Sequence, residues 1–318
     1  MTNNDMTTFE MPKEIVIHEV GLRDGLQVEK TVVPIEEKIK WVDALIHADV
    51  KMIQLGSFVN PQKVPQMADT DALFSHFSQN DKKPKDVILS GLVLNEKGLE
   101  RGMACGVDLF CMGASASETH SLKNTGMPVS EAVTRITAMA KNAMNAGKRI
   151  QVSVQSAFGC GFEGPIPEEN VLKIIETYLQ AGVKNISLAD TAGHAYPFQV
   201  IRLYNRIRQM DPSVELACHF HNTYGLGLAN CFAALHAGVK YFESAFGGLG
   251  GCPFTKVPAG NVSTEDLVHS MLRSGLSMGL QLDPLIELAK NVSQFFGRDL
   301  PGFVMKSGSI VNFKKKES

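Results

Sequence analysis

The sequence predicts an α/β fold in which eight parallel strands alternate with helices and close into a (β/α)8 TIM barrel, with extra helices after the eighth strand. Three observations support this prediction. Short β-branched apolar runs recur along the chain, and stretches with helical apolar spacing separate them. Eight such units match the strand number of a TIM barrel. The first loop, residues 21–25 (GLRDG), lacks the GxGxxG motif of an open dinucleotide-binding sheet.

The predicted strands are short runs rich in Val, Ile and Leu that stop at Gly or at polar residues. The first run ends at Gly21. The second runs into residues 56–61 (GSFVNP), which are predicted as a loop because of their Gly and Asn-Pro signals. The eight predicted strands cover residues 14–20, 50–55, 87–93, 107–112, 150–155, 185–189, 214–219 and 239–245.

The connecting segments show helical apolar spacing. The spacing is clearest between residues 34 and 47, where Ile35, Ile39, Val42 and Ile46 share one face. Further helices are predicted over residues 96–105, 130–145, 167–181, 197–210, 227–237, 264–272 and 283–296, the last two beyond the eighth strand. Because no linker-like stretch divides the chain, residues 13–318 are predicted to form one domain after a disordered tail, residues 1–12.

Composition excludes several functional classes. The hydrophobic content of 44% over 318 residues suffices for one large core, and the net charge of −2 shows no basic excess of the kind that binds nucleic acid. The chain has no apolar run of about 18 residues, so we expect no membrane partner. Six scattered cysteines without a CxxC motif, together with an N-terminus unlike a secretory signal, indicate reduced thiols in a cytoplasmic protein.

Two histidines, His219 and His221, end the seventh predicted strand. Residues two apart on a strand point to the same face, so both imidazoles can reach one metal ion. The alternative is that two histidines share a face at a strand end without any ligand. The barrel favours the metal, because the active sites of TIM barrels are built at the C-terminal ends of the strands.

Other polar residues are expected at the same rim. They lie at the ends of the first, second, fifth, sixth and eighth predicted strands or directly after them, in the order Arg23, Asp24, Gln27, Gln54, Ser57, Gln155, Asp190, Thr191 and Asn261. Oxygen and nitrogen ligands without thiolate suit Mg²⁺, Mn²⁺ or another borderline divalent ion. The sequence therefore predicts a divalent-cation site.

Several motifs resemble those of the hydroxymethylglutaryl-CoA lyase family, whose members are metal-dependent lyases on TIM barrels. Residues 19–27 (EVGLRDGLQ) are similar to the family's Arg-Asp signature after the first strand, and residues 57–67 (SFVNPQKVPQM) to its loop after the second. Residues 248–254 (GLGGCPF), Gly260-Asn261 and residues 264–268 (TEDLV) resemble the family's glycine-rich loop and the segment directly after it. The resemblance covers about residues 14–300, with the motifs in the same order.

The resemblance implies roles for individual residues. It implies metal ligation by Asp24, His219, His221 and Asn261, and stabilisation of a developing enolate by Arg23, for which the alternative is a structural salt bridge to Asp24. It places Cys252 on a mobile loop as an acid/base participant, alongside Asp24 and His219 as further candidates for proton transfer. The family's substrate-side positions correspond to Ser57, Asn124, Ser187, Asp190 and Thr191. Gln27 and Gln54 at the rim are further candidates for substrate binding, and Lys30 is either a contact for CoA phosphates or a solvated surface lysine.

Two positions depart from the family pattern. Gln54 stands where the family has glutamate, and Asn222 stands where it has aspartate. Each change removes a negative charge near the expected cation, and an amide is a weaker acceptor for Arg23 or for a ligand histidine. The substrate could therefore differ from that of the family's lyases.

The resemblance implies C–C cleavage of a 3-hydroxy-3-methylglutaryl-CoA-like thioester to acetyl-CoA and a keto acid, acetoacetate, by a homodimeric enzyme. The alternatives within this fold are a lyase for a different 3-hydroxyacyl-CoA and an aldolase acting on a 2-keto acid. An alternative of another class is a barrel that binds the metal without catalysis. Retained Arg23, Cys252 and the four ligand types argue against that last alternative.

Overall fold

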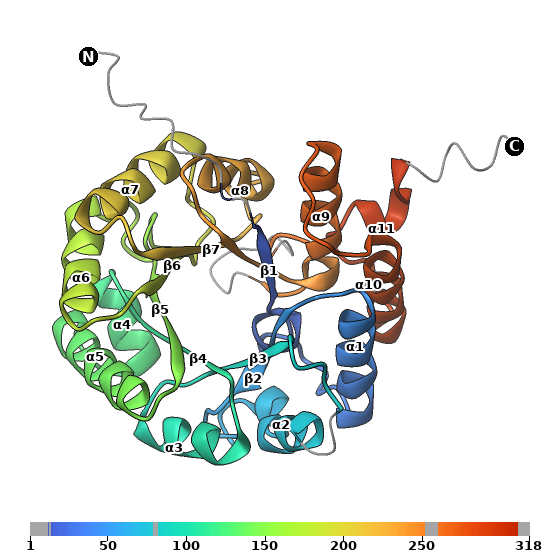
Figure 1. The fold of residues 1–318 in the computed structure, drawn as a ribbon, viewed down its shortest axis with the longest axis horizontal. Coiled ribbons are helices and arrows are strands. Elements are labelled where there is room, and N and C mark those ends of the chain that lie inside the picture. Colours follow the sequence, from blue (N-terminus) through green and yellow to red (C-terminus); the bar gives the residue numbers. More distant parts are fainter. Residues whose placement is uncertain (1–11, 13, 79–81, 252–259, 311–318) are drawn as a thin grey trace, which may run out of the picture.

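The computed structural model describes residues 12, 14–78, 82–251 and 260–310. Eight parallel strands pair in chain order, and β8 pairs with β1 to close the barrel, as predicted. Helices form a ring around the outside (Figure 1). The strands are β1 (Val16–Glu19), β2 (Met52–Ser57), β3 (Ile88–Leu92), β4 (Leu109–Ser115), β5 (Arg149–Gln155), β6 (Asn185–Asp190), β7 (Glu215–Phe220) and β8 (Tyr241–Ser244).

Apolar faces of the surrounding helices pack on the outer face of the barrel, where side chains such as Ile53, Val152 and Leu188 are fully buried. These helices are α1 (Ile35–His47), α2 (Thr70–Ser78), α3 (Glu96–Cys105), α4 (Glu118–Thr125), α5 (Val129–Asn145), α6 (Glu168–Gln180), α7 (Pro197–Met210) and α8 (Gly227–His236). After β8 come α9 (Thr264–Arg273), α10 (Leu282–Phe296) and α11 (Val304–Ser307), beside α1 in Figure 1. Three short turns, η1 (Gly21–Gly25), η2 (Pro65–Met67) and η3 (Phe246–Gly248), complete the described elements.

Two predictions about elements were wrong. The second strand continues through Gly56 and Ser57, which were predicted to begin a loop. Gly56 serves close packing there, because a Cβ atom on it would lie 2.4 Å from the Thr70 hydroxyl. The helices α2, α4 and α11 have no counterpart in the prediction. Each has at most nine residues, which is too short for a clear apolar periodicity.

The interior of the barrel changes in character along its axis. Towards the N-terminal ends of the strands, Met52, Leu109 and Cys111 form an apolar cluster against Val16 and Ile88. Towards the C-terminal ends the inward residues are mostly polar and line an open chamber. No helix among the described residues is both long and apolar enough to cross a membrane.

Candidate metal centre and active site

A chamber of about 750 Å³ opens at the C-terminal end of the barrel. Its wall includes Arg23, Asp24, Gln54, His219 and His221, which sequence reasoning placed at this rim. The chamber therefore joins residues that lie up to 228 positions apart in the chain, from Arg23 to Gly251.

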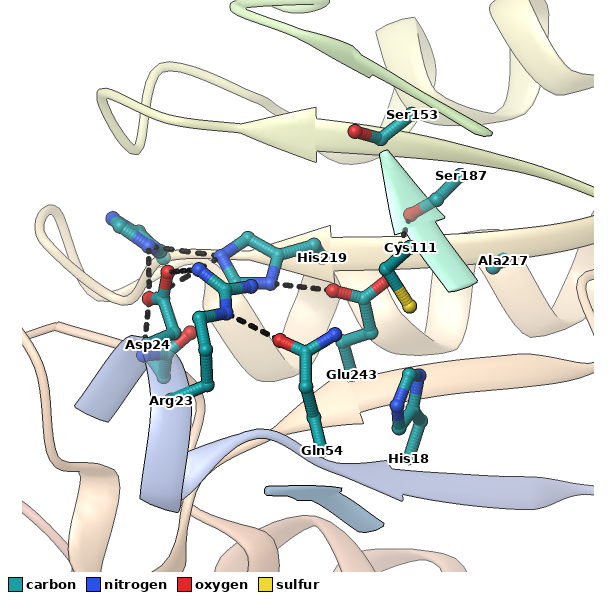
Figure 2. Close-up of polar contacts among 12 residues, drawn as sticks. His18, Arg23, Asp24, Gln54, Cys111, Ser153, Ser187, Ala217, His219 and Glu243 are labelled. Atoms are coloured by element: carbon teal, nitrogen blue, oxygen red, sulfur yellow. Dashed lines mark hydrogen bonds and ion pairs between the residues drawn. The ribbon is translucent and has the colours of Figure 1, made fainter. Parts of the chain in front are cut away.

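Arg23 and Asp24 lie on η1, a single wide helical turn directly after β1. The amide of Gly25 bonds to the carbonyl of Val20 at 3.3 Å, five residues earlier, which closes this turn. The Arg23 guanidinium donates from Nη1 to Asp24 Oδ1 and from Nε to Gln54 Oε1 (Figure 2). Both partners fix the guanidinium at the wall of the chamber.

The Asp24 carboxylate is held in its charged form. Burial alone would raise its pKa, but Arg23 and the adjacent imidazoles hold the pKa of Asp24 well below the ordinary value. Asp24 Oδ2 lies 3.8 Å from His219 Nε2 and 3.7 Å from His221 Nε2. The arrangement places one negative charge opposite two ring nitrogens.

His219 and His221 both turn toward this carboxylate. His219 is the penultimate residue of β7, His221 comes directly after the strand, and their Nε2 atoms are 3.0 Å apart. The side-chain alternation predicted from the strand is thus confirmed. The shared face is directed into the chamber and not into packed core.

Asn261 reaches the centre because its segment pairs with the end of β7. His221 and Asn261 form an antiparallel bridge, and the amide of Asn222 bonds to the carbonyl of Gly260 at 2.7 Å. The Asn261 amide group donates from Nδ2 to Asp24 Oδ2 and to the Leu249 carbonyl, both at 2.9 Å. This pairing brings the Asn261 side chain beside the Asp24 carboxylate.

The donor set fits a divalent cation. Ligand atoms of Asp24, His219 and His221 lie within 4.8 Å of one another. The Oδ1 atom of Asn261 is buried and has no hydrogen-bond partner in the described part of the chain. A buried carbonyl oxygen without a donor is costly unless something else binds it, and a cation would do so. One carboxylate, one amide oxygen and two imidazoles suit Mg²⁺ or Mn²⁺.

Glu243 is a functional residue that sequence reasoning missed. His219 donates from Nδ1 to Glu243 Oε2 at 3.0 Å, and Ser187 donates to Glu243 Oε1 at 2.9 Å (Figure 2). Burial opposes the charge of this carboxylate, but the hydrogen bond from His219 lowers the pKa of Glu243 overall. The contact fixes the tautomer of His219 and leaves its Nε2 free to bind a metal. The signal in the sequence that could have identified Glu243 is that it is the one acidic residue of the short apolar strand β8.

The other residues predicted to bind substrate fall into two groups. Gln27, Asn124, Ser187 and Thr191 line the chamber with Gln54. Ser57, Asp190 and Lys30 are not among its lining residues. Ser57 and Asp190 are fully buried, and Asp190 Oδ1 accepts from the amides of His194 and Ala195 at 2.8 and 3.1 Å. Asp190 thereby holds the loop after β6, and burial raises its pKa to about 6.

Asn222 does not face the metal ligands as expected. Its Oδ1 accepts from the amide of Gly227 at 2.9 Å, at the start of α8. An amide oxygen makes this contact as a carboxylate would. Gln54, in contrast, contacts Arg23 directly, so of the two departures from the family pattern Gln54 is the one that alters the chamber.

The glycine-rich segment is anchored by two buried carboxylates. Glu19 Oε1 accepts from the amides of Gly21 (2.7 Å) and Phe246 (3.1 Å), and Glu265 Oε2 accepts from the amide of Gly247 (3.0 Å). Burial raises the pKa of Glu19 to about 7 and that of Glu265 to about 8. Gly247 has a φ of 65°, a conformation that glycine adopts without strain. Cys252, the predicted acid/base residue of this loop, lies outside the described residues.

Comparisons with known proteins agree with this geometry. The profile of the HMGL-like family matches residues 14–292. Hydroxymethylglutaryl-CoA lyase YngG of Bacillus subtilis is 34% identical over 91% of this chain and 96% of its own length. (R)-citramalyl-CoA lyase of Chloroflexus aurantiacus is 35% identical over 93% and 95%. A solved HMG-CoA lyase of Acinetobacter baumannii, in complex with coenzyme A and 3-methylmalate, superposes with a TM-score of 0.87 at 37% identity, covering 94% of this chain and 96% of that one.

Proposed function

This chain belongs to the HMGL-like family and is a carbon–carbon lyase, and we propose that it cleaves a 3-hydroxy-3-methylglutaryl-CoA-like thioester. The products are acetyl-CoA and a keto acid, which is acetoacetate when the substrate is 3-hydroxy-3-methylglutaryl-CoA. The observation that carries the proposal is the convergence of Asp24, His219, His221 and Asn261 beside Arg23 in one chamber.

The four ligand residues would hold a divalent cation, Mg²⁺ or Mn²⁺. Such an ion would acidify the tertiary hydroxyl of the substrate and polarise the oxygen that chelates beside it. Glu243 would assist metal binding by His219, because its carboxylate accepts from Nδ1 and so orients the ring.

The remaining steps use residues of the chain. A base removes the proton of the 3-hydroxyl group, and the electron pair of that O–H bond forms the new carbonyl. The bond between C2 and C3 breaks, and its electron pair moves to C2 and the thioester oxygen as an enolate. Arg23 lines the chamber where that negative charge develops, and its guanidinium is always charged and held by two partners. Protonation at C2 then gives acetyl-CoA.

An acyl-CoA substrate is further supported by the rim of the chamber. Lys63 and Lys123 add positive charge there, Gln27 and Asn124 add polar side chains, and Arg135 forms an ion pair with Glu96. Cationic side chains around an entrance suit the phosphates of a CoA carrier. Lys30, which was expected in this role, is exposed and lies outside the lining.

A second substrate is a citramalyl-CoA-like thioester. One reason is the similarity to the (R)-citramalyl-CoA lyase of Chloroflexus aurantiacus. The other is Gln54, a neutral partner of Arg23 at a position where the resemblance to the hydroxymethylglutaryl-CoA lyases implies a glutamate. The same chemistry serves both substrates, because each has a hydroxyl at the carbon that becomes the carbonyl. An aldolase acting on a free 2-keto acid would not need the cationic rim.

The test is to incubate the protein with Mg²⁺ and each thioester and to measure acetyl-CoA release. We expect release from 3-hydroxy-3-methylglutaryl-CoA that stops on addition of EDTA and returns with Mn²⁺ or Mg²⁺. Release from the citramalyl thioester alone would move the assignment to the second substrate. No acetyl-CoA from either thioester at high enzyme concentration would refute a CoA-dependent lyase.

Cytoplasmic location and a homodimer belong to the same proposal. They rest on reduced thiols in the sequence and on the resemblance to the family, respectively. Light scattering after size exclusion would test the dimer through its mass, twice the 34.6 kDa of one chain.

A further inference from the structure

The chamber continues past the metal ligands into the middle of the barrel. There its lining includes Gln54, Cys111, Gln151, Ser153, Ser187 and Glu243, which we call the deep subsite. A TIM barrel is usually filled at this level by bulky branched side chains. Here the chamber extends to this level, so a substituent at C3 of the substrate has room beneath the proposed metal ligands.

Short side chains create this room. Along the strands Cys111 pairs in register with Gln151, Ser153 with Ser187, and Ser187 with Ala217. Figure 2 shows the short side chains of Cys111 and Ser187 near the Glu243 carboxylate, with Ser153 and Ala217 farther from it. The wall beside Ser153 is Gly113, where a Cβ atom would lie only 2.1 Å from the Ser153 hydroxyl oxygen. Gly113 therefore serves close strand packing, and the room in the subsite comes from the short side chains of Cys111, Ser153 and Ser187 that line it.

The deep subsite also contains a buried hydrogen-bond donor without a partner. The side chain of Gln151 is buried, and its Nε2 group has no hydrogen-bond partner within the described ranges of the chain. Its Oε1 atom has a contact of 3.8 Å from the Cys111 thiol, so the amide presents its donor side unpaired. Leaving such a donor buried is costly, and a ligand acceptor would remove that cost.

The charge of the subsite argues against an anionic ligand group. Glu243 brings a buried carboxylate to its wall, and the Arg23 guanidinium is already bonded to Asp24 and Gln54. A second carboxylate placed beside Glu243 would meet like charge at low dielectric constant. A neutral group that accepts a hydrogen bond fits both Gln151 and Glu243.

We propose that the deep subsite binds the 3-substituent of the acyl chain and selects a neutral substituent that is larger than methyl and carries a hydrogen-bond acceptor. The preferred substrates are then 3-hydroxyacyl-CoA thioesters with such a substituent at C3. This inference rests on the proposed lyase function and names the substrate class within it. Gln151 is the residue that determines the preference.

The experiment compares 3-hydroxyglutaryl-CoA thioesters that differ only at C3, with methyl, propyl, 2-hydroxyethyl or carboxymethyl as the substituent. Acetyl-CoA release gives kcat/KM for each. We expect the 2-hydroxyethyl compound to exceed its propyl isostere and the anionic carboxymethyl compound by about tenfold each, and to exceed the methyl compound. Fastest cleavage of the methyl compound would overturn the inference and leave the lyase function standing. If none of the four compounds releases acetyl-CoA, both this inference and the proposed lyase function are refuted.

A variant isolates the donor. Gln151→Leu keeps the size of the side chain and removes its amide, so the preference for 2-hydroxyethyl over propyl should fall about tenfold, to near one. Gln151→Met provides a second, unbranched replacement if the leucine variant does not fold. The matched control Gln180→Leu makes the same change on the exposed face of α6 and should leave the ratio unaltered. An unchanged ratio in the Gln151 variants would overturn the assignment of this residue.

Discussion

The two ends of the barrel interior are built from the same eight strands and have opposite character. At the N-terminal end, Met52, Leu109 and Ile88 pack together. The charged residues of that end form ion pairs near the surface, including Lys240 with Glu14 at 2.8 Å and Lys51 with Asp86 at 2.7 Å. At the C-terminal end, Arg23, Asp24, His219, His221 and Glu243 converge around one chamber, with few bulky side chains between them.

This difference separates stability from function along one axis. Apolar packing at the N-terminal end stabilises the barrel, whereas buried charges at the C-terminal end are held by contacts with one another and with polar side chains such as Gln54 and Ser187. We therefore expect changes at the C-terminal end to affect metal binding and turnover, and changes at the N-terminal end to affect the free energy of unfolding. Four substitutions test this division.

The largest effect is expected from His219→Ala. It removes one proposed metal ligand and leaves Glu243 Oε2 without the donor at His219 Nδ1. Metal affinity, measured by titration calorimetry, and acetyl-CoA release should both fall by more than about 100-fold, which is the upper range for loss of a supporting outer partner. His236→Ala, the same change at the exposed end of α8, should alter neither. Retention of full metal affinity in His219→Ala would refute the ligand assignment.

Glu243→Gln should have the next largest effect. The amide can still accept from His219 Nδ1, but the negative charge that strengthens this contact is lost, and metal affinity should fall about tenfold. The control is Glu215→Gln, the same change on the same sheet at its N-terminal end, where the carboxylate is exposed. Equal metal affinities in the two variants would show that Glu243 does not support the centre.

The sequence allowed prediction of the barrel and of most residues of the candidate metal centre, for physical reasons. Strand runs and helical spacing are local signals, and His219 and His221 are two residues apart, so one strand sets their shared face. Glu243 could not be assigned in this way, because its role depends on the register of β7 with β8, which pairs it with His219. The role of Asn222 was misjudged because its side-chain oxygen accepts a hydrogen bond from the start of α8. This contact depends on the conformation of the loop after β7, which the sequence pattern does not specify.

Leu109→Ala tests the opposite end of the barrel. Leu109 is 4% exposed and belongs to the apolar cluster there. Its truncation should lower the free energy of unfolding by about 2–4 kcal/mol, measured by urea titration, through lost burial and the cavity left behind. Metal affinity should stay within about twofold. Leu122→Ala, at a 51% exposed position, should cost less than about 0.5 kcal/mol. Weakened metal binding in Leu109→Ala with Leu122→Ala unaffected would show that the two ends are coupled.

Glu265→Gln should have the smallest effect, and one that depends on pH. Burial raises the pKa of Glu265 to about 8 from an ordinary value of 4.5, so the folded protein keeps a proton that the unfolded chain releases. Its contribution to stability is present below about pH 4.5 and is lost as pH rises through about 8. Glutamine imitates the protonated acid, including acceptance from the amide of Gly247. Melting temperatures of variant and parent should therefore agree at pH 5, and the variant should melt higher than the parent at pH 8, where the parent has lost the contribution of the protonated acid. Glu287→Gln, exposed on α10, should match the parent at both pH values. An equal fall in melting temperature between pH 5 and pH 8 in the parent and in Glu265→Gln would contradict this prediction. It would show that Glu265, which anchors the glycine-rich segment, is already charged at pH 5.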